Sequence, residues 1–279
     1  MKWRCFDRTF DLSARGEIMG IVNVTPDSFS DGGSFASTES AIAHASTLIA
    51  EGAAIVDIGG ESTRPGAAEV GEAEEKARVI PVIEGVLERH PQATISIDTC
   101  KASVASAAIE SGAKIINDVT GFRDPAMVTV AASSGAGLVV MHMQGTPRTM
   151  QENPSYDDVV ADVRAFFTAR HETLISAGVD PEAIVYDPGI GFGKTLDHNL
   201  ELLRRLGEFT AVDRPLLLGV SRKSFIGSLV GSTEMDDRNW PTVAITSHAR
   251  EQGVPLFRVH EVSSNLQALR MTEAILTRP

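Results

Sequence analysis

One short pattern recurs along this chain and limits the folds that are open to it. A few apolar residues are followed by a polar residue, then by a turn and a stretch with helical spacing. The clearest polar residues of this kind are Asp98, Asn117, Asp187 and Lys223, which follow the apolar runs 94–97, 115–116, 184–186 and 216–220. A repeated buried strand with a polar residue at its carboxyl end is typical of a parallel α/β protein with an active site at that edge.

Eight such runs occur, and each has a plausible helix behind it. We expect strands at 18–22, 54–58, 94–97, 115–117, 138–141, 184–186, 216–220 and 256–259. The clearest helices are expected at 72–89, 103–111, 125–134, 157–177, 243–251 and 263–276. Neither a linker nor a change of composition divides the chain. The sequence therefore predicts a single-domain (β/α)8 TIM barrel at 18–279, preceded by a short N-terminal extension at 1–17, rather than a doubly wound sheet.

Composition narrows the class of protein. Hydrophobic residues make up 43% of the chain and charged residues 22%, both ordinary values for a globular domain. No apolar run approaches the ~20 residues of a membrane span, and the formal net charge of −12 argues against non-specific nucleic-acid binding. The N-terminus lacks a signal-peptide core, and Cys5 and Cys100 make no disulfide framework. We therefore expect a cytoplasmic protein that acts on small molecules.

One motif resembles a nucleotide site but fails in detail. Gly193-Lys194-Thr195 looks like the end of a phosphate-binding P-loop, yet that motif needs a glycine where this chain has Pro188. Proline removes one of the N–H groups that cradle phosphate. The glycines of this turn are better explained as giving the backbone room beside a ligand.

In a barrel, the carboxyl ends of the strands converge on one mouth. The polar residues gathered there would be Asn23, Asp98, Asn117, Asp187, Lys223, Arg258 and His260. Each has a simpler explanation when taken alone. The aspartates could cap helices, Asn117 could hold a turn, Arg258 could pair with an acid inside the barrel, and Lys223 could be solvated. Independent capping does not explain why two acids, two amides and three possible cations meet at one rim.

The set divides into two chemical groups. Carboxylates and amides recognise a planar heterocycle that is rich in N–H donors and ring acceptors. Arg258, His260 and Arg64, with Asn23 as an oxygen ligand to Mg²⁺, suit a phosphate or pyrophosphate group. The histidines show no zinc-binding spacing, His142 is more simply a packed, hydrogen-bonded histidine than a base, and Cys100 has no signature of a nucleophile.

Eight segments of the chain form an ordered set of motifs: NVTPDSFSDGG at 23–33, GGESTRPG at 59–66, IDT at 97–99, IIND at 115–118, MHMQG at 141–145, DPGIGFGK at 187–194, GVSRKSFIG at 219–227 and RVH at 258–260. Together these segments resemble the dihydropteroate synthase family of the folate pathway. The resemblance implies a (β/α)8 barrel, usually a homodimer, that joins 6-hydroxymethyl-7,8-dihydropterin pyrophosphate to 4-aminobenzoate and releases pyrophosphate with the help of Mg²⁺.

The resemblance also implies a role for each matching residue. The pterin would be bound by Asp98, Asn117, Met141, Asp187, Phe192 and Lys223. Pyrophosphate would be held by Asn23, Thr63, Arg64, Arg258 and His260, with Asn23 on the metal. The aminobenzoate pocket would use Phe29, Pro65, Lys223 and Ser224. Asp31, Lys223, Arg258 and His260 would be the catalytic residues.

Two other functions compete with the synthase interpretation. A pterin-dependent methyltransferase shares a pterin pocket, but it would give the loop at 23–33 and the cations Arg258 and His260 no task. A non-catalytic pterin-binding paralogue is the second alternative, although both long loops and every phosphate ligand are present here. One departure from the family is Glu261, where aspartate is common; it puts only the local support of His260 in doubt.

Overall fold

A computed structural model describes residues 1–24, 33–62, 68–209 and 213–276, with only the backbone of 33–37. Its strands are β1 (Lys2–Cys5), β2 (Arg8–Asp11), β3 (Glu17–Asn23), β4 (Ile55–Gly59), β5 (Ile95–Asp98), β6 (Ile115–Asp118), β7 (Gly137–Met141), β8 (Ile184–Asp187), β9 (Leu217–Leu218) and β10 (Leu256–Val259). Its helices are α1 (Gly33–Ala50), α2 (Glu72–Arg89), α3 (Ala102–Glu110), α4 (Pro125–Ser134), α5 (Val159–Ser176), α6 (Leu196–Arg204), α7 (Ser224–Val230), α8 (Asn239–Glu251) and α9 (Val262–Leu276).

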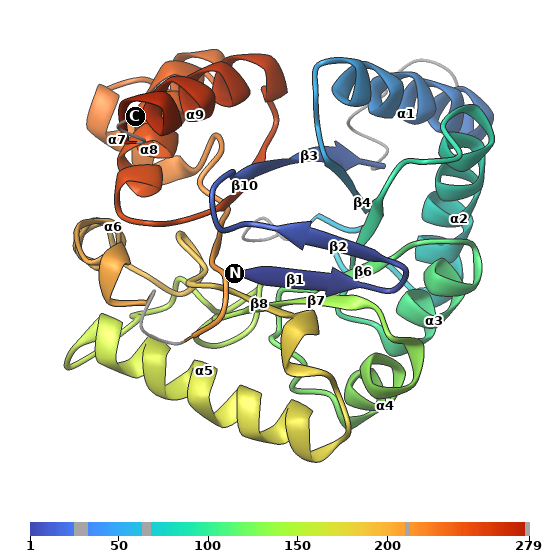
Figure 1. The fold of residues 1–279 in the computed structure, drawn as a ribbon, viewed down its shortest axis with the longest axis horizontal. Helices are drawn as coiled ribbons and strands as arrows, with labels where there is room; N and C mark the ends of the chain where they lie inside the picture. The colour runs from blue at the N-terminus through green and yellow to red at the C-terminus, as the bar shows by residue number, and fades with distance from the viewer. Residues whose placement is uncertain (25–32, 63–67, 210–212, 277–279) are drawn as a thin grey trace.

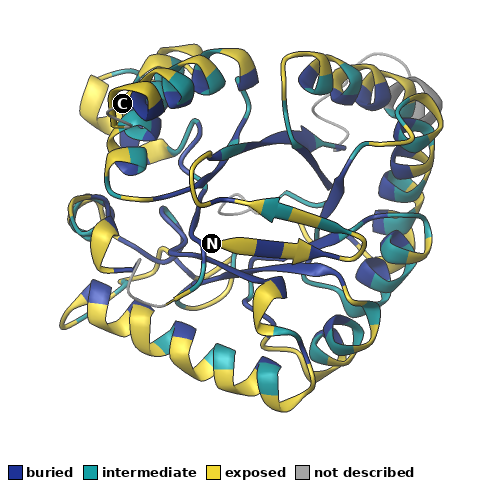
Figure 2. Ribbon diagram, in the orientation of Figure 1, coloured by how far each residue is buried: buried dark blue, intermediate teal, exposed yellow. Residues whose placement is uncertain are grey.

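Eight parallel strands form the barrel, in the order β8-β7-β6-β5-β4-β3-β10-β9. Between β8 and β9 the ring is closed by a parallel bridge from Tyr186 to Leu216 and by a 3.0 Å hydrogen bond from Tyr186 N to Pro215 O. Helices surround the strands (Figure 1), with their inner faces buried and their outer faces exposed (Figure 2). The predicted (β/α)8 barrel is confirmed.

The first residues of the chain close the floor of the barrel. β1 and β2 form an antiparallel hairpin that lies across the strand ends (Figure 1). Trp3, Cys5 and Leu12 pack in one buried cluster with an inward residue from each of seven strands: Met19, Ile55, Ile115, Val139, Val185, Leu217 and Leu256. The indole of Trp3 donates a 2.9 Å hydrogen bond to Ala183 O. This apolar plug leaves the opposite end as the place for polar chemistry.

Element boundaries follow the sequence prediction closely, with two exceptions. β9 is only two residues long, although its apolar run covers 216–220. The run leaves the ladder at Gly219, and Arg222 then has a left-handed φ of 59°. α8 starts at Asn239, four residues before the predicted Val243, because Pro241 fits the first turn of a helix, where no N–H is needed.

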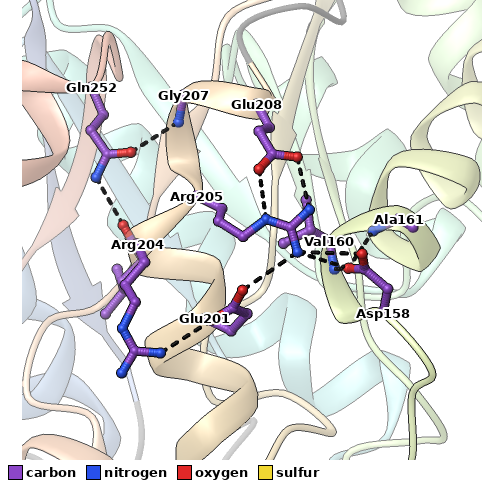
Figure 3. Close-up of polar contacts among 10 residues, drawn as sticks. Asp158, Val160, Ala161, Glu201, Arg204, Arg205, Gly207, Glu208 and Gln252 are labelled. Atoms are coloured by element: carbon purple, nitrogen blue, oxygen red, sulfur yellow. Dashed lines mark hydrogen bonds and ion pairs between the residues drawn. The ribbon is translucent and has the colours of Figure 1, made fainter.

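On the outside, a network of charges joins two neighbouring helices. Arg205, which follows α6, forms ion pairs with Glu201, Glu208 and Asp158, and Asp158 is the N-cap of α5 (Figure 3). Exposed pairs of this kind contribute little individually. They connect the end of α6 to the start of α5. No helix among the described residues is both long and apolar enough to span a membrane.

Candidate active site

Four strands carry a polar side chain two residues beyond an apolar one of the floor cluster. The pairs are Ile55 with Asp57, Ile115 with Asn117, Val185 with Asp187, and Leu256 with Arg258. Because side chains two apart lie on the same face of a strand, the second member of each pair points into the barrel above the first. The interior therefore changes from apolar at the floor to polar at the mouth within one pleat.

Arg258 organises the centre of this polar layer. Its Nε donates to Asp57 Oδ2 and its Nη2 to Asp98 Oδ2, both at 2.5 Å. Asn117 Nδ2 also donates to Asp57 Oδ2, at 3.1 Å. Burial raises the pKa of Asp98 to about 7, while the Arg258 guanidinium opposes that rise. Several strands are thus tied together through charged hydrogen bonds inside the barrel.

Asp57 belongs to this centre, although the sequence analysis does not single it out. Its side chain is fully buried, and its Oδ1 has no hydrogen-bond partner within the part of the chain that the structure describes. A buried carboxylate oxygen without a partner is costly. The sequence does hold a signal, since an acid interrupts the apolar run Ile55-Val56-Asp57-Ile58 on the face that becomes the interior.

Asp187 and Lys223 form the second polar group of the mouth. Asp187 is buried at the end of β8, and its Oδ1 accepts a 2.7 Å hydrogen bond from Gly189 N. Burial raises the pKa of Asp187. Lys223, just before α7, places Nζ 3.8 Å from the centre of the Phe192 ring. Burial lowers the pKa of Lys223 to about 8, although Asp187 opposes that fall.

A buried lysine shapes the loop between β8 and α6. Lys194 is 3% exposed, and its ammonium lies 2.9 Å from Gly189 O, 3.0 Å from Phe192 O and 3.0 Å from His142 Nδ1. Gly189 has a φ of 66°, and a Cβ there would lie 1.9 Å from His142 O, so only glycine fits. The apparent nucleotide motif is therefore a folded loop with its lysine turned inward. Burial lowers the pKa of Lys194 to about 7.

His142 is a partner of this lysine. It is buried, and burial together with Lys194 lowers its pKa to about 2, so the ring is neutral at physiological pH. Its Nδ1 accepts from Lys194, which confirms the expectation of a packed, hydrogen-bonded histidine. Cys100 is a free thiol that packs, partly buried, against the apolar cluster described next.

An apolar wall stands beside the polar groups. It consists of Val119, Met141, Met143, Met150 and Phe192. Both side chains that the family resemblance assigns to the pterin slot, Met141 and Phe192, are members of it. Thioether and aromatic surfaces suit the face of a flat ring, whereas the neighbouring carboxylates suit its polar edge. Asp187 and Lys223 lie at the border between the two.

The remaining predicted residues lie around the rim. Asn23 ends β3 and pairs in the ladder with Gly59. His260 follows β10, with Nδ1 2.9 Å from Ser221 Oγ. Ser224 is the first residue of α7 and is exposed. Glu261, the departure from the family pattern, pairs with Arg222 at 2.5 Å, so its carboxylate supports the β9–α7 turn.

Five predicted residues cannot be compared with the structure. Phe29, Asp31, Thr63, Arg64 and Pro65 lie outside the described residues. The structure brings Asp98, Asn117, Asp187, Lys223, Arg258, Met141 and Phe192 to one end of the barrel. Their individual roles toward substrates stay predictions.

Fold and site together define an enzyme of the α/β barrel class, with an apolar wall beside a charged mouth. The model of a family described as "Pterin binding enzyme" matches residues 19–260. Dihydropteroate synthase of Escherichia coli (strain K12) is 47% identical over 271 residues, covering 96% of this chain and 94% of that protein. The enzyme of Synechocystis sp. is 44% identical, covering 95% and 92%.

Solved structures agree with these relatives. Dihydropteroate synthase of Yersinia pestis, in a sulfonamide drug complex, superposes with a TM-score of 0.93 at 42% identity and full coverage of both chains. The Xanthomonas albilineans enzyme in complex with 7,8-dihydropteroate gives a TM-score of 0.90 at 39% identity, again over both whole chains. The present chain therefore belongs to the dihydropteroate synthase family of pterin binding enzymes.

Proposed function

We propose that this barrel joins 6-hydroxymethyl-7,8-dihydropterin pyrophosphate to 4-aminobenzoate, giving 7,8-dihydropteroate and pyrophosphate. The observation that carries the proposal is the polar layer above the apolar floor, where carboxylates, an amide and two cations face one another beside a Met and Phe wall. The relatives named above support it. The charged mouth favours an anionic leaving group, which a methyl-transferring or non-catalytic protein would not need.

The heterocycle end of the substrate would lie between the wall and the acids. The dihydropterin ring presents several N–H donors along one edge, and the Asp187 carboxylate has an oxygen, Oδ2, left to accept from it. Asp98 and Asn117 would flank the ring, with Met141 and Phe192 against its face. Lys223, over the Phe192 ring, would donate to a ring acceptor.

The leaving group would lie toward β10. A guanidinium has five N–H donors, and within the described residues Arg258 uses two of them, on Asp57 and Asp98, so the others could bind an anion. His260 lies two residues further along the same strand end. With Asn23, Thr63 and Arg64, these groups would hold the pyrophosphate and stabilise the charge it gains when the C–O bond breaks.

Mg²⁺ is the metal ion that we assign to this end. Mg²⁺ is commonly held by one or two protein oxygens together with substrate phosphates. Asn23, at the end of β3, is the residue that would supply such an oxygen from its side-chain amide. When bound, the ion supplies Lewis-acid neutralisation of the pyrophosphate charge.

The aminobenzoate would enter from the rim. Ser224 is exposed beside Lys223. By the family resemblance, Phe29 and Pro65 would complete the pocket, and Asp31 could approach the reacting carbon. We infer that pyrophosphate leaves before the amine attacks, because an arylamine is a weak nucleophile and the named residues stabilise a leaving anion. Scrambling of ¹⁸O within dihydropterin pyrophosphate, without aminobenzoate, tests this order; no scrambling in a complex that turns over favours direct displacement, provided the bound pyrophosphate can rotate.

The reaction itself has a direct test. Purified protein is mixed with dihydropterin pyrophosphate, 4-aminobenzoate and Mg²⁺, and dihydropteroate and pyrophosphate are measured. We expect both products in equal amounts, and none when either substrate is left out. A folded sample that binds the pterin but forms no dihydropteroate would contradict the proposal and favour the non-catalytic alternative.

We also propose a homodimer located in the cytoplasm. Seven of the ten exposed large apolar side chains in the described chain lie between α7 and the end of α9, including Trp240 at 76% and Ile275 at 69% exposure. A second copy of the chain is the partner that the family resemblance favours. Sedimentation should show a dimer, and Trp240→Glu should shift it toward monomer.

The free thiols of Cys5 and Cys100 support a reducing compartment.

A further inference from the structure

Ser221 contacts the same histidine twice. It lies 8% exposed in the turn between β9 and α7. Its Oγ is 3.1 Å from the backbone N of His260 and 2.9 Å from the ring Nδ1 of His260. In the part of the chain that the structure describes, these are the two partners of the hydroxyl. The two contacts together determine where hydrogens can lie.

The backbone contact has only one possible direction, because a peptide N–H donates and the Ser221 oxygen must accept. The hydroxyl hydrogen then has Nδ1 as its acceptor. If Nδ1 of a neutral ring carried the ring hydrogen, the hydroxyl would accept twice, and its own hydrogen would have no partner among the described residues, which is unfavourable for a buried group. The neutral ring is therefore the tautomer with its hydrogen on Nε2.

When the His260 ring is protonated, Nε2 also carries a hydrogen. An imidazolium carries hydrogens on both nitrogens, and Nδ1 would then donate to Ser221 Oγ after the hydroxyl rotates. In both charge states Nε2 bears a hydrogen. His260 can consequently donate through Nε2 but has no lone pair there for a metal ion.

A second contact, between the neighbours of Ser221 and His260, holds the same two chain segments together. Arg222, next to Ser221, pairs with Glu261, next to His260, and also donates to Asn239 Oδ1 at 2.9 Å. Arg222 has a left-handed φ of 59°, a conformation that a non-glycine residue holds only when its surroundings fix it. The turn after β9 and the end of β10 are thus joined by two adjacent pairs of side-chain contacts.

We propose that Ser221 is a positioning residue that makes His260 an obligate donor through Nε2, so that this nitrogen binds an oxyanion of the substrate and not the metal ion. The identity of that oxyanion as pyrophosphate rests on the proposed function. The direction of the hydrogen bond between Ser221 and His260 is independent of the proposed function.

Two measurements test the inference without turnover. Long-range proton–nitrogen correlation spectra report the tautomer of His260, whose signals are assigned with His260→Gln. Calorimetry with Mg²⁺ and inorganic pyrophosphate, and separately with 6-hydroxymethyl-7,8-dihydropterin, reports the two ends of the site. We expect the Nε2–H tautomer in the unsubstituted protein. Ser221→Ala should populate the other tautomer and bind pyrophosphate about tenfold more weakly, the loss of about one hydrogen bond to a charged group.

Matched variants separate positioning from general damage. Ser221→Thr keeps the hydroxyl and should restore both readings, and Ser228→Ala, the same change on the exposed side of α7, should alter neither. The pterin affinity of Ser221→Ala should be unchanged. An Nδ1–H tautomer in the unsubstituted protein, an unaltered pyrophosphate affinity in Ser221→Ala, or an equal loss of both affinities would overturn the inference. Absence of dihydropteroate formation by the unsubstituted protein would instead contradict the proposed reaction.

Discussion

Two lysines, Lys194 and Lys223, both contact Phe192 but differ in their hydrogen bonds. Lys194 directs its ammonium to the carbonyl of Phe192, to Gly189 O and to His142 Nδ1, which matches the three hydrogens of an ammonium. Lys223 instead faces the ring of Phe192 at 3.8 Å, and no hydrogen bond joins its ammonium to any residue that the structure describes. Desolvation lowers the pKa of both, although Lys194 is fully buried and Lys223 only partly so.

This contrast separates a structural charge from a functional one. A lowered pKa is common to both lysines and so does not distinguish them. What differs is the number of hydrogens that already have acceptors. A buried cation whose donors are all used stabilises its own loop, whereas one with donors unused is available to a ligand.

Of the substitutions that distinguish the two lysines, Lys223→Met should have the largest effect, and this effect should be on turnover. Lys223→Met removes a preorganised charge from the mouth, and such losses typically cost about 10² to 10³ in turnover. The free energy of unfolding should not fall, because no hydrogen bond to a described residue is lost. Steady-state kinetics and urea unfolding measure the two quantities. A variant that unfolds easily yet keeps its turnover would show that the roles of the two lysines are reversed.

The matching substitution at Lys194 should act mainly on stability. Lys194→Met leaves the carbonyls of Gly189 and Phe192 without donors, and unsatisfied buried groups cost about 1–3 kcal/mol each, so we expect a loss of about 3 kcal/mol. Urea unfolding measures it. Lys2→Met, on the exposed hairpin, is the control and should change stability by less than about 0.5 kcal/mol. A loss no larger than that of the control would contradict the structural role.

The decline of activity above about pH 8 should follow Lys223 and not Lys194. Its pKa of about 8 means that the charged form predominates below pH 8 and is lost above it. The kcat/KM for dihydropterin pyrophosphate should therefore fall about tenfold between about pH 8 and about pH 9.3, as one required proton is lost. Lys223→Arg, which stays charged, should move this decline upward. If Lys194→Met, and not Lys223→Arg, moved the decline of kcat/KM to another pH, the group that titrates would be Lys194, which would contradict the assignment to Lys223.

The smallest effect is expected for a substitution of Phe192, which both lysines contact. Phe192→Leu removes the ring beneath Lys223 but keeps the carbonyl that binds Lys194. A cation over an aromatic face contributes about 0.5–1 kcal/mol when partly exposed, so dihydropterin affinity should fall about threefold. Calorimetry measures this fall. An unfolding loss as large as that of Lys194→Met would mean that the ring, and not the carbonyl, holds the loop.

Much of this architecture is predictable from the sequence because its signals are local. An apolar run, a polar residue and a glycine stop identify a strand and its helix without knowledge of neighbours, so the sequence alone predicts Asp98, Asn117 and Asp187 at the mouth. The barrel follows from counting such units. Boundaries shift only where a strand leaves its ladder, at Gly219, or where a proline fits a first turn, at Pro241.

Long-range pairing is not predictable in the same way. Asp57 and Arg258 are 201 positions apart, and nothing local shows that one is the partner of the other. Lys194 stands in an incomplete phosphate motif, and its spacing does not reveal that Gly189 lets the loop fold back over His142. The contact between Ser221 and His260 likewise depends on two strand ends being neighbours. Motifs supply the identity of the side chains, and only the closed barrel supplies their hydrogen-bond partners.

The closure between β8 and β9 has a mechanical consequence. Other neighbouring strands share at least two ladder positions, but this join relies on the bridge from Tyr186 to Leu216. Amides protected by so short a ladder can exchange with solvent through local opening, without global unfolding. Asp187 and Lys223 stand on opposite sides of that join, so opening would separate them first. On heating, ligand affinity should disappear before helical circular dichroism, and a ligand touching both sides should act as a crosslink that raises the melting temperature.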